Sequence, residues 1–355
     1  MLHSRSTLQS FWHKLPRPIT ILAPMESVTD LVFRDMVHRM GRPMVYMTEF
    51  IQAKALLKCE REAMRRLGFN ETQRPIVAQI WGNNPQDYFE AAQAIHRRGF
   101  DGIDINMGCP VRKITAKGAC SALINNSQLA AELIIAAREG AVAAFTKYGN
   151  DHEGPENRIQ QDVPLPVSVK TRTGFKKLQT EEWCGFLLTQ GIQLLTIHGR
   201  TAIQQSEGMA DWQEIKRAVA LRNEIAPETL LVGNGDITEF SQFDEYSKHY
   251  GVDGIMVGKG IFNNPFIFRN AYFHELSPAE HIAWAWLHLK NYRAAYKGRR
   301  NFEIMKKFFK IYLRNFDGAD QLCEQIMAAH DYDEAEQLLS FHASGYGVKN
   351  LLAVL

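Results

Sequence analysis

The residues most able to do chemistry in this sequence stand directly after short apolar runs. Cys109 lies in the cluster Asn106-Met107-Gly108-Cys109-Pro110, where the glycine and the proline favour a turn that presents the thiol. A presented thiol can act as a nucleophile or as a proton donor. A single cysteine is more often a buried structural residue, but the flanking glycine and proline favour the catalytic interpretation here.

Lys170 follows the apolar run 167–169 and has three interpretations. It can be an ordinary lysine that pairs with Glu49 or Asp104. A desolvated lysine can form a Schiff base with a carbonyl substrate, as in aldolases built on barrels. A charged lysine can stabilise negative charge that develops on a cofactor ring. The residues alone leave these chemistries open.

Three further clusters combine glycine with polar or charged residues and favour the binding of an anion. Glycines allow backbone N–H groups to approach a phosphate closely, and a guanidinium binds anions through paired hydrogen bonds. One such cluster is weak evidence, whereas two after the last two apolar runs favour a phosphate site. The clusters are His198-Gly199-Arg200, Asn234-Gly235-Asp236 and Gly258-Lys259-Gly260.

These clusters end eight short apolar runs that alternate with amphipathic helical segments. Continuously apolar strands between helices indicate a parallel sheet covered on both faces. Eight such units fit a (β/α)8 TIM barrel better than a doubly wound sheet, and in a barrel the clusters would share one face. The predicted strands are 20–25, 45–50, 75–81, 102–107, 166–171, 194–198, 230–233 and 254–257, and the helices between them include 86–98, 128–144, 180–190 and 212–225.

The strand pattern stops near residue 278, beyond which only helical periodicity continues. We therefore expect an N-terminal extension at 1–18, a TIM barrel at 19–272 and a smaller C-terminal helical domain at 278–355. The polar segment 147–164, rich in Gly, Pro, Asn and Asp, is predicted to be a surface insertion in the barrel. The predicted helices of the second domain are 279–296, 302–315, 319–329 and 332–343.

The composition is that of an ordinary globular protein, with 45% hydrophobic and 23% charged residues. No apolar stretch reaches the length of a membrane span, and residues 1–18 lack a signal-peptide core, so no membrane attachment is expected. The five cysteines are widely spaced and match no zinc motif, so we expect no metal and reduced thiols in the cytoplasm. A monomer is expected. The net charge of +2 by itself suggests no nucleic-acid partner.

The charge is nevertheless unevenly distributed along the chain. Between residues 290 and 314 there are nine Lys or Arg residues against one glutamate, with six aromatic residues interleaved. Such a segment is usually a solvated helix face over a packed aromatic stripe. Basic and aromatic residues together are also typical of a surface that contacts nucleic-acid phosphates.

From the residues alone, we predict a barrel that binds a phosphorylated ring through its last two strand ends. Gln79, Asn106 and Lys170 would surround the ring, with the thiol of Cys109 close by. A planar phosphorylated ring beside a proton donor favours flavin mononucleotide (FMN). Physical reasoning alone does not choose this cofactor over an aldolase.

With these residues assembled, the sequence resembles the bacterial-type tRNA-dihydrouridine synthases. The resemblance spans about residues 19–268 and continues more faintly over 305–339. Its specificity rests on the order and spacing of all the motifs rather than on any single one. The motifs are Ala23-Pro24-Met25, Asp104-Ile105-Asn106-Met107-Gly108-Cys109-Pro110, Val169-Lys170-Thr171-Arg172, Ile197-His198-Gly199-Arg200, Gly233-Asn234-Gly235-Asp236-Ile237 and Gly258-Lys259-Gly260.

The resemblance implies an FMN-dependent oxidoreductase that reduces the C5=C6 double bond of one uridine in tRNA, with NADPH or NADH as the hydride source. Cys109 would protonate carbon 5 as a general acid, and the uridine would be flipped out of its loop to reach the site. The implied FMN-binding residues are Ala23, Pro24, Met25, Gln79, Lys170, His198, Asn234, Gly235, Asp236, Gly258 and Lys259. The implied substrate-binding residues are Asn106, Arg112, Lys113, Arg200, Lys306 and Lys307.

Two residues depart from the family pattern. Lys259 stands where an arginine is usual, which keeps the charge but loses the planar fork. Cys120 stands where glycine or alanine is usual, which predicts a second thiol near the site. The alternatives to the tRNA enzyme are an FMN-dependent small-molecule oxidoreductase, a Schiff-base aldolase acting through Lys170, and a tRNA-folding chaperone.

Overall fold

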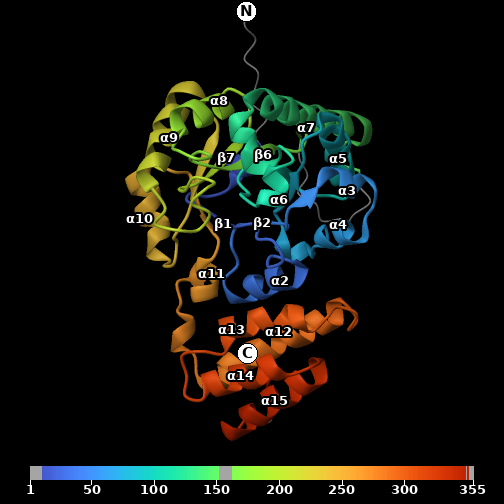
Figure 1. Cartoon of the computed structure of the whole chain (residues 1–355), viewed down its shortest axis with the longest axis vertical. Helices are drawn as coiled ribbons and strands as arrows, with labels where there is room; N and C mark the ends of the chain where they lie inside the picture. Colours follow the sequence, from blue (N-terminus) through green and yellow to red (C-terminus); the bar gives the residue numbers. More distant parts are fainter. Residues whose placement is uncertain (1–9, 152–161, 349, 352–355) are drawn as a thin grey trace, which may run out of the picture. The chain divides into compact units, whose positions relative to one another are not determined.

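The computed structural model describes residues 10–151, 162–348 and 350–351, and the chain divides into two compact units (Figure 1). The first unit is Met1–Leu31 with Pro43–Gly258, and the second is Val32–Arg42 with Lys259–Leu355. Most of the predicted insertion, residues 152–161, lies outside the described residues, as do residues 1–9 of the predicted N-terminal extension. The expected domain limits stay a prediction.

Parallel strands of the first unit form a closed barrel, as predicted. Within the described residues the sheet order is β2-β1-β9-β8-β7-β6-β5-β4-β3, and an additional pairing of β2 with β4 closes it. The short β3 (Ile51–Gln52) pairs with the end of β4 and was not predicted. The eight barrel strands are β1 (Ile19–Leu22), β2 (Val45–Met47), β4 (Ile76–Trp81), β5 (Gly102–Asn106), β6 (Val167–Arg172), β7 (Leu194–His198), β8 (Leu230–Asn234) and β9 (Gly254–Val257).

The interior of the barrel is lined by apolar side chains. Side chains such as Ile21, Val77 and Val232 form one buried cluster there. Phe11 and Trp12 of α1 (Phe11–Lys14) belong to the same cluster, so this short helix covers the amino end. Burial of the strands on both faces explains why they are apolar throughout.

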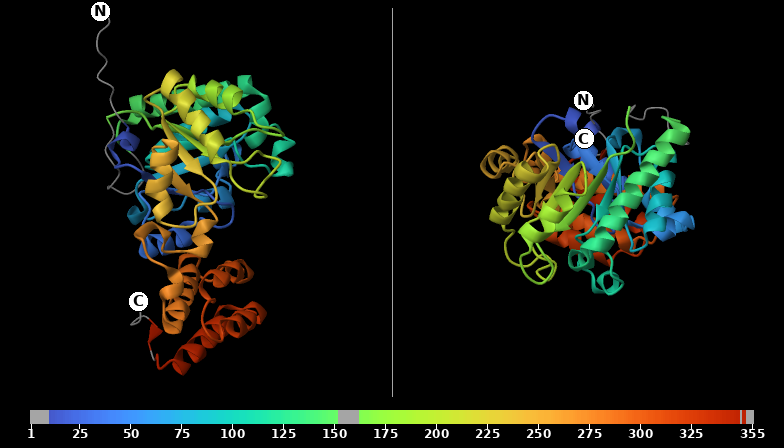
Figure 2. Two further views of the ribbon diagram at one scale, coloured as in Figure 1. Left: turned by 90° about the vertical axis from the view of Figure 1, so that its left-hand side faces the viewer. Right: turned by 90° about the horizontal axis from the view of Figure 1, so that it is seen from above.

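Helices surround the strands, as the labelled elements in Figure 1 and the right-hand view of Figure 2 show. Side-chain caps begin the longer ones, for example Asn84 before α5 and Asp211 before α9. Gly140 allows α7 to pack directly on α5, because a Cβ there would lie 2.2 Å from the carbonyl oxygen of Phe89. The helices of eight or more residues around the barrel are α5 (Pro85–Arg97), α7 (Ser127–Tyr148), α9 (Trp212–Ile225) and α10 (Ser241–Tyr250). The shorter helical segments are α3 (Ala53–Leu57), α4 (Arg61–Arg66), α6 (Arg112–Thr115), a π-helical turn (Thr180–Cys184) and α8 (Gly185–Leu188).

The second unit is helical, and the four helices predicted for it are present. Its core is aromatic: the ring of Phe33 stacks on Phe308 at 5.4 Å, and the ring of His288 lies 4.7 Å from the same phenylalanine. Phe33 comes from α2 (Leu31–Met40), between the first two barrel strands, and its place in this core was not predicted. The other helices are α11 (Gly260–Asn263), α12 (Pro278–Ala295), α13 (Glu303–Tyr312), α14 (Ala319–Ala328) and α15 (Tyr332–Gly345).

No helix in the described parts of the chain is both long and apolar enough to cross a membrane. Over the same residues, no group of three or more His, Cys, Asp or Glu side chains is placed to hold a metal ion.

Candidate active site

The carboxyl ends of neighbouring strands bring several of the predicted site residues together. Strand register places Gln79 opposite Asp104, Asn106 opposite Lys170, and His198 opposite Asn234. These side chains come from β4 to β8, so they form a polar layer beyond the apolar interior of the barrel. The carboxyl end of such a barrel is where TIM-barrel enzymes carry their active sites.

Three buried side chains form a chain of hydrogen bonds with a fixed direction. Gln79 Nε2 donates to Asp104 Oδ2 at 2.7 Å, and Gln79 Oε1 accepts from Asn106 Nδ2 at 3.0 Å. Asn106 Oδ1 then accepts from the backbone N–H groups of Gly108 and Cys109 at 3.1 and 2.9 Å. A carboxylate only accepts, so Asp104 sets which way both amides point and thereby holds the Cys109 loop.

Asp104 was not predicted as a site residue, although it lies in the predicted strand. Ser168 Oγ donates to its other oxygen at 2.6 Å, so both carboxylate oxygens accept hydrogen bonds. Burial raises the pKa of Asp104 to about 6, while the hydrogen bonds from Ser168 and Gln79 and the charge of Lys170 oppose that rise. Asp104 is therefore ionised at neutral pH and organises the amides around it.

Lys170 is half-buried and donates from Nζ to Asn234 Oδ1 at 3.1 Å. Asn234 is oriented in turn because its Nδ2 donates to the carbonyl of Met256 at 2.8 Å. Burial and, to a smaller extent, the charge of Arg172 lower the pKa of Lys170, while the charges of Asp104 and Cys109 raise it; the resulting pKa is about 8. Lys170 is thus cationic at neutral pH, which suits a group that stabilises negative charge on a ring.

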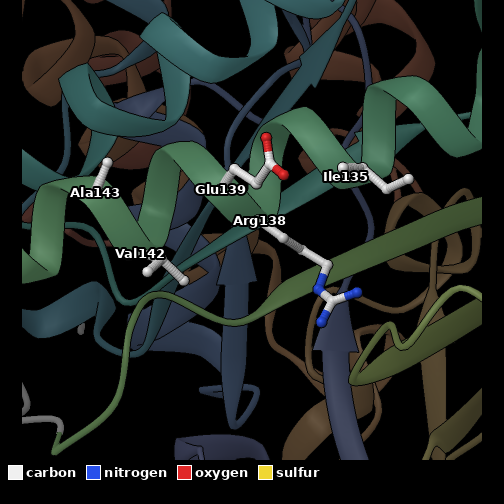
Figure 3. Close-up of a pocket in the computed structure, with 5 residues that line it drawn as sticks. All are labelled: Ile135, Arg138, Glu139, Val142 and Ala143. Carbon is white, nitrogen blue, oxygen red and sulfur yellow. The ribbon is translucent and has the colours of Figure 1, made fainter.

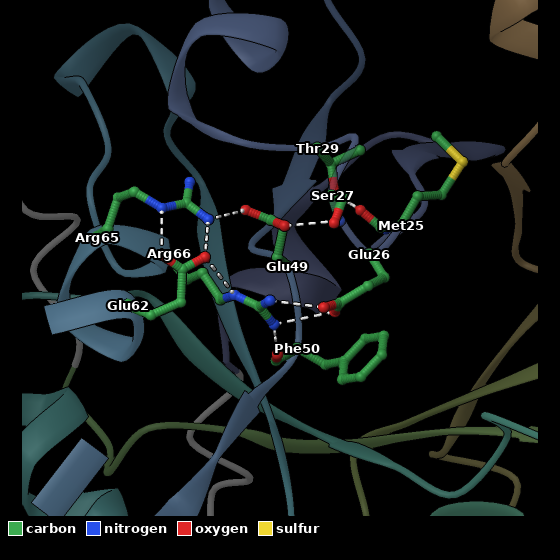
Figure 4. A network of polar contacts seen from close by, with 9 residues as sticks. All are labelled: Met25, Glu26, Ser27, Thr29, Glu49, Phe50, Glu62, Arg65 and Arg66. Atoms are coloured by element: carbon green, nitrogen blue, oxygen red, sulfur yellow. Dashed lines mark hydrogen bonds and ion pairs between the residues drawn. The ribbon is translucent and has the colours of Figure 1, made fainter. Parts of the chain in front are cut away.

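Glu49, the other carboxylate considered as a partner of Lys170, belongs to a different network (Figure 4). Its buried side chain accepts from the Ser27 backbone N–H at 2.7 Å and lies 3.5 Å from the guanidinium of Arg65. The adjacent Arg66 donates to Glu26 at 2.9 Å and to the carbonyl of Phe50 at 2.9 Å. These contacts hold the loop after β1 against the end of β2.

Cys109 is partly exposed, and its thiol contacts a second thiol. The hydrogen bond from Cys120 is the main cause that lowers the pKa of Cys109 to about 7; burial opposes it, and the Val111 N–H and the charge of Arg172 assist. Burial, together with Cys109 itself, raises the pKa of Cys120 well above its usual value. The sequence predicted a second thiol near the site, and the structure brings Cys120 close to Cys109.

Arg172 is a buried cation beside the Cys109 loop that was not predicted as a site residue. Its Nε donates to the carbonyl of Gly108 at 2.7 Å, and Nη1 donates to the carbonyls of Thr201 and Gln205 at 3.0 and 2.8 Å. Burial lowers its pKa to about 10, so the guanidinium stays charged. Its place at the end of a predicted strand was the available sequence signal.

His198, Arg200 and Asp236 form a group of their own. Arg200 Nη2 lies 2.7 and 2.8 Å from the two carboxylate oxygens of Asp236, and it also donates to the carbonyl of Gly208. Arg200 Nη1 lies 3.1 Å from His198 Nε2, which must accept because a guanidinium only donates. The proton of neutral His198 is therefore on Nδ1. Arg200 and Asp236 hold one another in this arrangement.

The two glycine clusters differ in what surrounds them. A Cβ on Gly235, whose φ is 130°, would lie 2.5 Å from the Cβ of Ala210 and 3.2 Å from the ring of His198. Packing therefore requires glycine at this position. A Cβ on Gly258 would meet Ala23 only at an ordinary 3.8 Å, so packing does not require glycine at this position.

The remaining predicted residues occupy varied positions. Ala23 is buried, whereas Pro24 and Met25 are half-buried after β1. Arg112 and Lys113 are exposed on α6. Lys259 follows Gly258 directly and begins the main segment of the second unit. Lys306 is buried and lies 2.5 Å from Glu303, whereas Lys307 is exposed.

A separate pocket lies on the outer face of α7 (Figure 3). Its lining includes the exposed apolar side chains Ile135 and Val142, while Arg138 extends to the carbonyl of Gln190 at 3.0 Å. The lining residues Ile135, Arg138, Glu139, Val142 and Ala143 include none of the predicted site residues.

The polar layer suits a phosphorylated flavin. Gln79 and Asn106 each keep hydrogen-bonding capacity beyond the bonds they make, Lys170 supplies a positive charge, and Gly258 offers open backbone. The fold and the polar layer together define a TIM-barrel enzyme with its site at the carboxyl ends of the strands.

Comparison with known proteins identifies the family. A family model described as "Dihydrouridine synthase (Dus)" matches residues 21–146 and 156–345. A "Probable tRNA-dihydrouridine synthase" of Staphylococcus aureus (strain COL) is 39% identical over 342 residues, which cover 93% of this chain and 95% of that protein. The "Probable tRNA-dihydrouridine synthase 2" of Bacillus subtilis (strain 168) is 40% identical over 340 residues, which cover 93% and 96%. The chain belongs to the dihydrouridine synthase family, whose members are flavin-dependent oxidoreductases, and the predicted resemblance is confirmed.

Proposed function

We propose that the chain reduces a specific uridine of tRNA to dihydrouridine, with FMN as cofactor and NADPH or NADH as reductant. The names of the relatives support the substrate and the product. The observation that carries the proposal for this chain is the Cys109 loop, which Asn106 and Arg172 hold at the carboxyl ends of the strands. We place the reaction in the cytoplasm, by a monomer and without a metal.

The barrel supplies the groups that would hold the cofactor. When bound, the flavin supplies the hydride that reduces the C5=C6 bond, and the nicotinamide nucleotide restores it. Gln79, Lys170 and His198 would hold the polar edge of the ring, with Pro24 and Met25 against its face. Asn234, Gly235 and Gly258 would receive the phosphate, for which the open backbone at Gly258 is the support.

Cys109 would deliver the proton to carbon 5 of the uracil. A thiol whose pKa is about 7 gives up its proton readily at neutral pH, and the hydrogen bond from Cys120 and the charge of Arg172 stabilise the thiolate that remains. Asn106 has a second amide hydrogen for a uracil carbonyl, because only one is used on Gln79. Asp104 fixes the direction of that amide and is a positioning residue.

The helical unit would bind tRNA through its backbone phosphates. Lys307 and Lys310 are exposed on α13, which supports such contacts. On the barrel, the exposed Arg112 and Lys113 would contribute phosphate contacts close to the Cys109 loop. The target base would have to be flipped out to meet Cys109.

Flavin binding and tRNA mapping test this proposal. Purified protein supplied with FMN should become yellow and should bleach with NADPH in the absence of oxygen. Transfer RNA from cells that lack the gene should lose dihydrouridine at one or a few positions. Protein that never binds FMN, or tRNA with unchanged dihydrouridine, would refute the proposal. If the purified protein binds FMN that NADPH bleaches, while tRNA of the deletion strain keeps all its dihydrouridine, the chain is a small-molecule oxidoreductase instead.

A further inference from the structure

Two thiols with different environments meet beside the proposed proton donor. The Ser121 backbone N–H donates to the carbonyl of Cys109 at 3.3 Å, and the Cys120 thiol lies close enough to Cys109 to lower the pKa of the Cys109 thiol. Both the side chains and the backbones of the two segments are therefore in contact. A disulfide requires the sulfurs about 2 Å apart with the two Cα atoms close together, and this contact supplies the starting arrangement.

The two cysteines also differ in exposure and in pKa. In redox-active pairs, one thiol reacts with the oxidant, and the second, resolving thiol attacks the oxidised product to form the disulfide. Cys109 is partly exposed and its pKa is lowered to about 7, so a large share is thiolate at neutral pH and open to oxidants. Cys120 is fully buried and stays protonated. A small oxidant therefore reaches Cys109 first, and the nearest sulfur able to attack the oxidised product is that of Cys120.

The other cysteines lack this combination. Cys184 is buried and burial raises its pKa to about 12, so it is unreactive. Cys59 is exposed, and Cys323 is partly exposed with a pKa that burial raises. The pairing of a reactive thiol with a buried one is thus a property of Cys109 and Cys120.

We propose that Cys109 and Cys120 are a redox modification site, which hydrogen peroxide converts into a reversible disulfide. The consequence for activity rests on the proposed role of Cys109 as proton donor, because a disulfide has no proton to give. The oxidation itself does not depend on that role. The disulfide would stop the enzyme during oxidative stress and protect its thiol from irreversible oxidation.

The chemistry balances with peroxide as the oxidant. The Cys109 thiolate attacks one oxygen of the peroxide, and the O–O bond breaks. The hydroxide that leaves takes up the proton that Cys109 had released and becomes water. Cys109 is then a sulfenic acid. The Cys120 sulfur then attacks the Cys109 sulfur, the S–O bond breaks, and the Cys120 proton leaves with the hydroxyl group as water. Two thiols and one peroxide give one disulfide and two waters.

The test uses the full-length protein treated with hydrogen peroxide and digested with trypsin without reductant. Arg112, Lys113 and Lys117 separate the two cysteines, so a disulfide would join peptides 99–112 and 118–138. We expect this joined peptide to be the main product and dithiothreitol to abolish it. In Cys120→Ser, Cys109 should instead progress to sulfinic acid at least about tenfold faster than in the unaltered chain, because no thiol captures the sulfenic acid.

Cys59→Ser is the matched control, since it removes an exposed thiol outside the pair, and it should form the joined peptide like the unaltered chain. If Cys109 reaches sulfinic acid equally fast with and without Cys120, and no joined peptide forms, the proposal is wrong. These readouts need neither tRNA nor flavin, so their failure is distinguishable from failure of the proposed function. A joined peptide in a protein without dihydrouridine activity would refute the proposed function alone.

Discussion

Asp104 determines the direction of the hydrogen bonds that reach the proposed proton donor. It accepts from Gln79, Gln79 accepts from Asn106, and Asn106 accepts from the backbone of the Cys109 loop. Each amide could point either way by itself, because its oxygen and nitrogen are nearly the same size. The carboxylate removes this ambiguity, so a residue with no place in the reaction still controls the geometry of the site.

Replacing Asp104 should therefore affect both stability and activity. Asp104→Ala leaves the buried donors of Gln79 and Ser168 without their acceptor, which should cost about 2–4 kcal/mol in the free energy of unfolding. Dihydrouridine formation per folded molecule should also fall by about tenfold or more, because the amide of Asn106 is free to turn. Urea unfolding and single-turnover rates measure the two effects.

Asp101 provides the control for this experiment, since it is a buried aspartate just before the same strand. It binds Arg74 at 2.9 Å and the Ile76 backbone N–H at 2.8 Å, at the opposite end of β5. Asp101→Ala should lower stability but leave the rate per folded molecule unchanged. Equal rates in both variants would contradict the positioning role of Asp104.

Helix α12 of the second unit carries a histidine that makes the stability of this unit depend on pH. His288 is fully buried, and its Nδ1 lies 3.0 Å from the hydroxyl of Tyr312. Burial lowers the pKa of His288 to about 3, so it stays neutral in the folded protein. The unfolded chain takes up a proton below about pH 6.5, which the folded chain cannot do until about pH 3.

The contribution of His288 to the stability of the second unit should therefore be constant above about pH 6.5 and should fall as the pH decreases below it. The slope from this residue approaches about 1.4 kcal/mol per pH unit, and the lowered pKa of His281 adds to it. His288→Asn, which keeps an acceptor near Tyr312, should flatten the profile of unfolding free energy between pH 6.5 and 5. His330→Asn, at an exposed histidine, should leave the slope as it was; a slope unchanged in His288→Asn would contradict this account.

At the scale of the elements, periodicity predicted most of the fold, and the polar residues at the strand ends predicted which side chains the barrel brings together. The eight barrel strands were predictable because burial on both faces makes them continuously apolar. The helices α12 to α15 were predictable because burial of one stripe leaves apolar residues at helical spacing. The place of α2 in the second unit was not predictable, since its pattern is that of any barrel helix. Asp104 and Arg172 were also missed as site residues, because their roles depend on partners that are distant in sequence.

The charge of the whole molecule is informative only through its distribution. The basic segment 290–314 meets acidic residues of α15: Lys290 lies 3.0 Å from Glu336, and Arg293 lies 2.6 Å from Asp333. Lys306 and Lys307 were predicted together as tRNA contacts, yet Lys306 is buried against Glu303. Neighbouring residues of a helix point in different directions, so sequence alone does not separate their environments.

Transfer RNA binding should depend on the exposed lysines of α13. The double variant Lys307→Ala/Lys310→Ala should weaken binding and reduce the salt slope by about 1–2, because each phosphate contact releases a counterion. Fluorescence anisotropy at several salt concentrations measures both. The control is Lys216→Ala/Lys248→Ala, which removes the same charge from outer helices of the barrel and should keep the salt slope. An equal loss of tRNA affinity in the two double variants would argue against a specific phosphate surface on α13.

The central claim is that Cys109 donates the proton in an FMN-dependent reduction of uridine. The most direct measurement compares the unaltered chain with Cys109→Ala, using unmodified tRNA, FMN and NADPH, and counts dihydrouridine by mass spectrometry. We expect Cys109→Ala to bind FMN and tRNA normally, whereas its dihydrouridine formation should fall by about 10²-fold or more. A Cys109→Ala protein that forms dihydrouridine at the unaltered rate would contradict it.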